Sequence, residues 1–345
     1  MDKITYEKSG VNIDTADATK REMAKYVNSN NQRVLNKVGA FASLYDIKFP
    51  EMKNPILVLK TEEPGSKQKF AFKYGKIKNI CYDMINHLTN DILVMGATPL
   101  TVQDAIICSK IEKDVVSDLV KYISQACKDN GSVLTGGETS EQPDVVEKGI
   151  YVLTSSIVGI VEKENIVDGS KIQKGDVVIA LPSNGIHTNG YSFLRMMLEQ
   201  FPEIENEEIE KGETFIDVIM RSHTAYYNVL TPLFGNDNLV GMAHITGGGL
   251  QGNLNRILPE KFSAQIDLTK IKILPIFKFI KAKTQTDDAE LLKTFNMGVG
   301  MTVVVKKGSE DEFLAHFKKL GTDAYVIGEI VDGDKTVKFT GQLQY

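Results

Sequence analysis

The chain has 345 residues, of which 42% are hydrophobic and 25% charged, and its formal net charge at pH 7 is −5. These fractions are typical of a globular protein of about two domains, and they exclude disordered and fibrous classes. A slightly acidic balance provides no broad basic field and no apolar run approaches the ~18 residues of a membrane span, so we expect no nucleic-acid and no membrane partner.

Two further features bear on the compartment. Residues 1–5 contain no signal-peptide core, so we expect a cytoplasmic protein. The three cysteines, Cys81, Cys108 and Cys127, lack metal-ligand spacing. We therefore expect buried, neutral thiols rather than a disulfide framework or a zinc site.

The first half of the chain alternates predicted helices and strands. In chain order, we expect a helix over residues 16–26, a strand over 56–59, a turn-rich segment over 61–67, a helix over 80–95, a strand after 98–100, a helix capped by Asp114 and ended by Gly131, and strands at 132–134 and 151–161. The polar residues 168–176 are the expected boundary between two domains, 1–168 and 169–345.

The helix expected over residues 80–95 has two distinct faces. Its apolar face carries Cys81, Met84, Ile85, Leu88 and Ile92 at helical spacing. The other face carries Asp83, His87, Asn90 and Asp91, whose oxygens suit a magnesium–polyphosphate ligand. The alternative is an ordinary solvated face.

Two glycine-rich segments are predicted at strand ends. The first is Gly136-Gly137-Glu138-Thr139, where Glu138 would face a metal ion or a substrate donor. The second is Thr246-Gly247-Gly248-Gly249, which follows His244 and offers a hydroxyl without an acid. Each of them, taken singly, is also compatible with a tight turn.

The second half contains the most informative segment, residues 185–192. It follows a predicted strand over 176–181 and opens a helical pattern, so its backbone N–H groups would face an anion such as phosphate. His187 adds a group that titrates near neutral pH, and Asn189 adds an amide. The alternative is an ordinary turn with Asn189 as the helix N-cap and His187 on the surface.

The remaining elements expected are a solvated acidic connection over 203–210, a long helix over 215–233, a strand over 240–245 and a strand over 302–305. Two mixed halves result, which indicates α+β or α/β sandwich domains. A P-loop, a complete dinucleotide fingerprint and a G-x-S-x-G hydrolase motif are all missing from the sequence.

These segments match a known family in order along nearly the whole chain, and the sequence resembles phosphoribosylformylglycinamidine cyclo-ligases, the aminoimidazole ribonucleotide synthetases. The matching segments are Tyr6 with residues 10–14, Asn90-Asp91 with residues 96–99, residues 136–139, residues 168–171, residues 185–192, residues 243–249 with Asn253, Arg256 and Pro259, and residues 294–301.

The resemblance implies an α+β fold of two α/β sandwich domains with mixed sheets. The N-terminal domain would bind ATP and pair its sheet with that of a second copy in a homodimer. The implied reaction converts formylglycinamidine ribonucleotide, a small phosphoribosyl substrate, and ATP into aminoimidazole ribonucleotide, ADP and phosphate. ATP would place a phosphoryl group on the amide oxygen, the amidine nitrogen would attack, and phosphate would leave.

The resemblance also implies roles for individual residues. Magnesium would be held by Asp91, Glu138 and Glu62, with a potassium ion as a further candidate. The reacting centre would be lined by His187, Asn189 and His244. ATP or phosphate would be bound by Lys25, Gly65, Ser66, Lys67, Gly136, Gly137, Thr139, Thr246, Gly247 and Gly248.

Some segments depart from the family pattern. The first phosphate loop, T-D-G-V-G-T-K in the family, reads Thr61-Glu62-Glu63-Pro64-Gly65-Ser66-Lys67, and Pro64 lacks a backbone donor. The family's Pro-Thr-x-Ile-Tyr segment appears as Ser222-His223-Thr224-Ala225-Tyr226. Two alternatives therefore stay open: a catalytically weak paralogue that binds a nucleotide or a partner, and a related ATP-using enzyme with another small phosphorylated substrate.

Overall fold

The computed structural model describes residues 18–19, 21–27, 31–36 and 40–345. The chain divides into two compact units, and each unit contains its own sheet. The first unit comprises Met1–Ile92 and Thr98–Lys163, and the second comprises Leu93–Ala97 and Glu164–Tyr345. The expected fold class of two mixed α/β domains is confirmed. The residues quoted between Tyr6 and Asp14 lie outside the described part.

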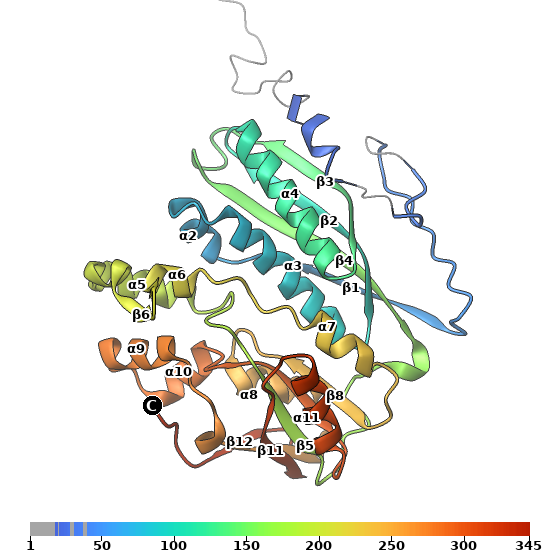
Figure 1. Ribbon diagram of the computed structural model, residues 1–345, viewed down its shortest axis with the longest axis vertical. Coiled ribbons are helices and arrows are strands. Elements are labelled where there is room, and N and C mark those ends of the chain that lie inside the picture. The colour runs from blue at the N-terminus through green and yellow to red at the C-terminus, as the bar shows by residue number, and fades with distance from the viewer. Residues whose placement is uncertain (1–17, 20, 28–30, 37–39) are drawn as a thin grey trace, which may run out of the picture. The chain divides into compact units, whose positions relative to one another are not determined.

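The first unit is a four-stranded sheet with helices on it. The strands run in the order β1-β4-β2-β3, with β2 and β3 parallel and the other pairs antiparallel. Helices α3 and α4 lie side by side across this sheet (Figure 1). The bounds are β1 Pro55–Glu62, α2 Lys67–Lys73, α3 Ile77–Leu93, β2 Thr98–Cys108, α4 Lys113–Asp129, β3 Val133–Glu141 and β4 Tyr151–Glu162.

Helix α3 confirms the amphipathic pattern but not its solvated alternative. The five apolar side chains predicted for its inner face are fully buried. On the other face Asp83 and Asn90 are also fully buried and His87 is only 7% exposed. Because burying polar groups costs free energy unless they are paired, this face is held by specific contacts rather than by water.

Two local predictions in this unit were wrong. The N-cap of α4 is Glu112, and Asp114 lies in the first turn, where an acidic side chain favours the positive end of the helix dipole. Residues 136–139 do not form a loop at a strand end. They lie inside β3 and pair with β2 over their whole length.

The second unit is built on a six-stranded sheet in the order β12-β9-β11-β5-β10-β8, which is antiparallel except for β12 and β9. The strand bounds are β5 Val177–Pro182, β6 Glu208–Glu210, β7 Glu213–Thr214, β8 Leu239–His244, β9 Phe262–Asp267, β10 Val299–Val305, β11 Tyr325–Asp332 and β12 Val337–Thr340. The α-helices are α5 Tyr191–Gln200, α6 Phe215–Ile219, α7 Tyr227–Leu230, α8 Gly249–Leu254, α9 Pro275–Thr284, α10 Asp288–Thr294 and α11 Glu310–Lys319. Short 3-10 turns occupy Lys163–Asn165, Pro202–Asn206, Thr231–Leu233, Asn255–Ile257 and Leu268–Lys270.

Strands β10 and β8 are buried at every position, although β8 is an edge strand of the sheet. Helix α11 packs Phe313 and Phe317 into the same apolar cluster as Val303 and Val305 of β10. Continuous apolar runs such as that of β10 are expected where both faces of a sheet are covered. The strand predicted over residues 240–245 corresponds to β8, Leu239–His244.

The long helix predicted over residues 215–233 is instead broken into α6, α7 and a 3-10 turn. Between α6 and α7 the side chain of Arg221 binds the carboxylates of Glu210 and Glu213 and the backbone oxygen of Asn184. These contacts hold residues 221–226 in a connection without regular secondary structure. That connection carries His223 and Thr224 to the site described below.

The three cysteines are free and buried, as predicted. Burial raises the pKa of the Cys108 thiol to about 11, and it also raises the pKa values of Cys81 and Cys127. None of the described helices is long and apolar enough to cross a membrane.

Candidate active site

Gly190 shapes the end of the segment between β5 and α5. Gly190 is the N-cap of α5 and has a φ of 85°. A Cβ on Gly190 would lie 2.2 Å from the ring of Phe295, so both the backbone and the packing require glycine here. The alternative of Asn189 as the N-cap was therefore wrong, and so was the placement of His187 on the surface, since His187 is 1% exposed.

Asn296 fixes the start of this segment from the neighbouring loop. Its side-chain amide donates to the backbone oxygen of Gly185 at 2.9 Å, and its oxygen accepts from Ser183 at 3.0 Å and from the Gly298 backbone at 2.9 Å. Such a fully hydrogen-bonded buried amide stabilises one backbone conformation.

His187 is held in an unusual conformation. Its φ of 63° lies in the left-handed region that side chains rarely adopt. Its Nε2 accepts from the backbone N–H of Thr224 at 3.4 Å and lies 3.1 Å from the Thr224 hydroxyl. A Cβ on Gly300 would lie 2.8 Å from the imidazole and 1.9 Å from the hydroxyl of Tyr226. The packing thus leaves room for this ring only because residue 300 is glycine.

The second glycine-rich segment is organised by Asn253 of α8. The Asn253 amide donates to the backbone oxygens of Thr246, Gly247 and Gly249 at 3.2, 3.1 and 2.8 Å. Gly248 caps α8 with a φ of 92°. These bonds, together with the Gly249 N–H that donates to the Thr246 backbone oxygen at 3.0 Å, hold the turn before α8 in one conformation.

The structure brings these two segments of the second unit together. The Asn189 side-chain oxygen would be 3.1 Å from a Cβ at Gly247. His244, the last residue of β8, hydrogen-bonds the His223 ring, and that ring in turn stacks on His187. The three predicted catalytic residues, His187, Asn189 and His244, therefore lie in one constellation with the predicted phosphate-binding turn of residues 246–248.

In the first unit, two of the predicted metal ligands, Glu62 and Asp91, both form an ion pair with Lys60. The Lys60 ammonium lies 2.9 Å from a Glu62 carboxylate oxygen and 3.1 Å from an Asp91 carboxylate oxygen. The His87 Nε2 lies 3.7 Å from the same Asp91 oxygen. Carboxylates that converge on one positive charge in this way are the ligand type that a hard divalent cation prefers.

Glu138 is not brought to this pair. It is exposed on β3, and β3 and β1 are opposite edges of the four-stranded sheet. Three strand spacings of ~4.8 Å separate the two edges by roughly 14 Å. Its neighbours Gly136, Gly137 and Thr139 share this position on β3.

The predicted phosphate-binding lysines have carboxylate partners. Lys67 is fully buried, and its ammonium lies 2.9 and 2.8 Å from the two carboxylate oxygens of Asp83. Gly65 and Ser66 form the turn before α2, with Gly65 at a φ of 64°. Lys25 is exposed and pairs with Glu22 at 2.7 Å.

Asp104 of β2 is a buried acid that the sequence did not single out. It opposes Gly137 on β3, and a Cβ on Gly137 would lie 1.8 Å from the Asp104 carboxylate. Burial raises the pKa of Asp104 from its usual 3.8 to about 7. Near neutral pH this carboxyl is therefore divided between its neutral and charged forms.

The raised pKa predicts a pH dependence of stability. A group whose folded pKa exceeds its unfolded pKa stabilises the protein most below the unfolded value, and this contribution is lost as pH rises through the folded value. We expect the free energy of unfolding to fall by on the order of 2 to 4 kcal/mol between pH 4 and pH 7 because of Asp104. Urea unfolding of wild type and Asp104→Asn over this range measures it, and parallel pH curves for the two proteins would contradict it.

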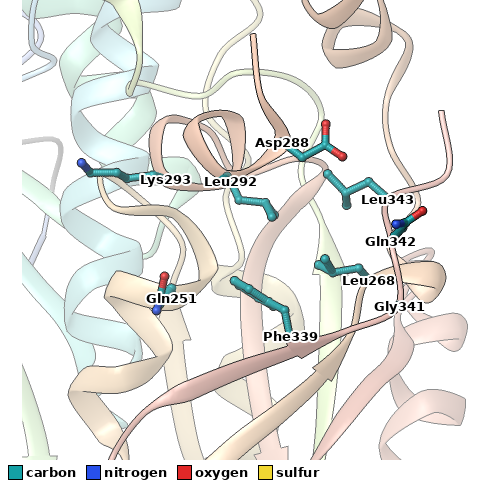
Figure 2. A pocket seen from close by; sticks show the side chains of 10 residues that line it. Gln251, Leu268, Asp288, Leu292, Lys293, Phe339, Gly341, Gln342 and Leu343 are labelled. Atoms are coloured by element: carbon teal, nitrogen blue, oxygen red, sulfur yellow. The ribbon is translucent and has the colours of Figure 1, made fainter.

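A cavity of about 300 Å³ lies elsewhere in the second unit. Figure 2 shows its walls, with Leu268, Leu292, Phe339 and Leu343 as apolar members and Gln251, Asp288 and Lys293 among the polar ones. None of the predicted site residues lines this cavity. We therefore do not place the reaction there.

The fold places the chain in a recognised structural class. It matches the hydrogenase maturation protein HypE of E. coli with a TM-score of 0.69 and 15% identity, covering 94% of each chain. It also matches a thiamine-monophosphate kinase from Stenotrophomonas maltophilia with a TM-score of 0.63 and 16% identity, covering 95% of this chain and 96% of that one. The protein is thus one of the two-unit α/β proteins that share this fold.

Sequence comparisons narrow the class to a family. The AIR synthase related protein N-terminal domain matches residues 43–161, and the AIR synthase related protein C-terminal domain matches residues 173–340. The chain belongs to the AIR synthase related family.

Two relatives with the same name match nearly the whole chain. A phosphoribosylformylglycinamidine cyclo-ligase of Alkaliphilus metalliredigens is 36% identical over 98% of both chains. One from Caldanaerobacter subterraneus subsp. tengcongensis is 38% identical over 95% of this chain and 98% of its own. The predicted resemblance to the cyclo-ligases, and with it the prediction of an enzyme, is confirmed.

Proposed function

We propose that the chain catalyses the ATP-dependent cyclisation of formylglycinamidine ribonucleotide to aminoimidazole ribonucleotide, a step of purine biosynthesis. The observation that carries the proposal is the constellation in the second unit, where His187, Asn189 and His244 meet the glycine-rich turn of residues 246–248. Near full-length identity to cyclo-ligases supports the same reaction.

The residues of this constellation suit the two demands of the reaction. The attacking amidine nitrogen must lose a proton, and an imidazole such as that of His187 or His244 can accept it. Phosphate must be bound as it forms and leaves, and the backbone N–H groups at the start of α5 favour an anion. Asn189 supplies an amide that orients a polar substrate group without adding charge.

ATP as the second substrate has independent support. HypE has been solved in complex with ATP, and that structure matches this chain with a TM-score of 0.65 and 16% identity. AaThiL has been solved with AMPPCP and TMP, and it matches with a TM-score of 0.59 and 17% identity. These likenesses support an ATP site in the fold, which we propose this chain retains.

The donor set around Lys60 fits a divalent cation. Glu62 and Asp91 already place carboxylate oxygens within 3.1 Å of one positive charge, the Lys60 ammonium. We propose that these two residues hold magnesium, which would offset the negative charge of the transferring phosphoryl group. The participation of Glu138, a role for potassium and a cytoplasmic location stay predictions, as do the roles of Lys25, Gly65, Ser66, Gly136, Gly137 and Thr139.

We also propose a homodimer formed through the sheet of the first unit. Strand β1 is an edge strand, and its side chains Ile56, Leu57 and Leu59 are 38, 49 and 70% exposed. Consecutive apolar side chains on an exposed strand are typical of an interaction surface. Sedimentation velocity distinguishes the two states, since a 38.2 kDa species would contradict the dimer.

The proposed function is tested by mixing purified protein with ATP, magnesium and formylglycinamidine ribonucleotide. Release of ADP that depends on the ribonucleotide, together with aminoimidazole ribonucleotide as product, is the expected result. Nucleotide binding without turnover would favour the catalytically weak paralogue. ADP release with another phosphorylated metabolite alone would favour a related ATP-using enzyme.

His187→Ala is expected to lower kcat on the order of 100-fold, because a positioned acid or base contributes about this much or more to proton transfer. The melting temperature is expected to change much less, since the surrounding segment is also held by Asn296. Steady-state kinetics and thermal unfolding of the same preparation check both expectations. A variant that melts at assay temperature would instead indicate a structural role for His187.

A further inference from the structure

Three of the five histidines of the chain meet in the second unit, and one of them belongs to no predicted site. His223 lies in the connection between α6 and α7, whereas His187 comes from the β5–α5 segment and His244 ends β8. His187 and His223 are each 1% exposed and His244 is 5% exposed. Burying a polar ring costs free energy unless its nitrogens are hydrogen-bonded. The contacts of the His223 ring therefore indicate its role.

His223 contacts both predicted catalytic histidines. Its ring stacks on that of His187, with centroids 3.9 Å apart and planes at 23°. Its Nε2 lies 2.8 Å from the Nε2 of His244, and its Nδ1 lies 3.5 Å from the Thr188 hydroxyl. The ring therefore presents a flat face to one histidine and a nitrogen to the other.

A hydrogen bond between two imidazole nitrogens restricts where protons can be. Exactly one proton must lie between them, because two bare nitrogens do not attract each other and two N–H groups repel. In a neutral pair, one ring is therefore protonated at Nε2 and the other at Nδ1. The Thr188 hydroxyl can either donate to His223 or accept from it, so it is compatible with both arrangements.

We propose that His223 is a positioning residue that couples the tautomer of the His244 ring to its own through the Nε2–Nε2 hydrogen bond. The proton position on His244 is then set together with that on His223 and cannot change alone. His187 is constrained independently, because its Nε2 accepts from the Thr224 backbone and its neutral ring is therefore protonated at Nδ1. The expected effect of His223 on turnover rests on the proposed function, whereas the inference about the tautomers does not.

Two substitutions separate the hydrogen bond from the stacking contact. His223→Gln keeps a polar group able to reach His244 but removes the aromatic face. His223→Phe keeps the aromatic face and removes the hydrogen bond. His223→Leu repeats the loss of the hydrogen bond with a smaller side chain, in case the phenyl ring prevents folding. His316→Gln, on α11, alters a histidine that bonds the Val229 backbone and serves as the control.

The tautomers are read from two-bond ¹H–¹⁵N spectra of protein labelled with ¹⁵N-histidine. In wild type we expect one Nε2 of the His223–His244 pair to be protonated and the other not. In His223→Phe the His244 nitrogen shifts should move away from their wild-type values, whereas in His223→Gln and His316→Gln they should stay close to them. Unchanged His244 nitrogen shifts in a folded Phe or Leu variant would overturn the proposal.

Kinetics supply the second readout. We expect His223→Phe to lower kcat on the order of tenfold with little change in KM, and His223→Gln to stay within about threefold of wild type. Equal losses of kcat in the two variants would show that stacking, not the hydrogen bond, matters, and would overturn the proposal. If wild type itself is inactive, the proposed function fails, while the nitrogen shifts still decide the tautomer inference.

Discussion

Asp91→Asn is expected to lower ATP turnover at least ~100-fold, which corresponds to about 2.7 kcal/mol of lost transition-state stabilisation. The substitution keeps the size of the side chain and removes its charge. In the structure that charge lies 3.1 Å from the Lys60 ammonium, beside Glu62. If magnesium takes this position with ATP, the loss of the Asp91 charge weakens magnesium binding beside the transferring phosphoryl group.

The fold should tolerate this change. The side chains of Lys60 and Asp91 are 37 and 19% exposed, and an ion pair that water reaches contributes on the order of 1 kcal/mol or less. Asp118→Asn is the matched control, since Asp118 is an exposed acid on α4 that pairs with Lys121 at 3.8 Å. Initial rates over a magnesium series should separate the variants, with Asp118→Asn like wild type. Wild-type kinetics in Asp91→Asn would remove Asp91 from the site.

Lys60 provides an internal check on the same position. If its ammonium occupies the place of a divalent ion, Lys60→Met should bind magnesium more tightly than wild type, because a competing charge has been removed. Calorimetric titration without ATP measures this directly. Weaker binding in Lys60→Met would indicate that magnesium, when bound, lies elsewhere.

Secondary structure was predicted correctly where the spacing of apolar residues alone determined the element. The apolar face of α3 and the buried strands β5 and β10 were predicted because apolar residues there follow the spacing of the element. The helix expected over residues 215–233 failed because helical periodicity says nothing about Arg221, whose side chain binds Glu210 and Glu213 across a chain reversal. Such tertiary contacts override local preference and leave no local signal.

The candidate site was predicted unevenly for a related reason. Glycine-rich segments next to His187 and His244 are visible as motifs, and the structure brings them together. Glu62 and Glu138 also looked equivalent, but strand order places them on opposite edges of one sheet, and strand order cannot be derived from a motif. Asp104 was missed because a lone acid next to Gln103 in a mixed strand has no motif, and its burial becomes visible only in the structure.

Lys67 shows most clearly how burial changes the meaning of a residue. A lysine after a glycine in a phosphate loop indicates a phosphate ligand, yet this ammonium is fully buried against Asp83. Burial lowers the pKa of Lys67, and Asp83 opposes that shift. An ion pair of this kind fixes the start of α2 to the middle of α3.

Lys67→Met is therefore expected to destabilise the protein by about 3 to 5 kcal/mol, because it leaves the Asp83 carboxylate buried without its partner. Asp83→Leu should cost a similar amount for the same reason. The double variant should recover most of the loss, since an apolar pair of similar volume often replaces a buried ion pair without net cost. Urea unfolding of the four proteins gives the coupling free energy.

The same four proteins distinguish a structural lysine from a phosphate ligand. A structural Lys67 predicts large losses of stability in the single variants and strong coupling between the two positions. A phosphate ligand predicts instead that Lys67→Met weakens ATP binding while its unfolding midpoint stays near that of wild type, with no recovery on adding Asp83→Leu. Because the ammonium is enclosed on the α3 side by Asp83, we expect the first pattern.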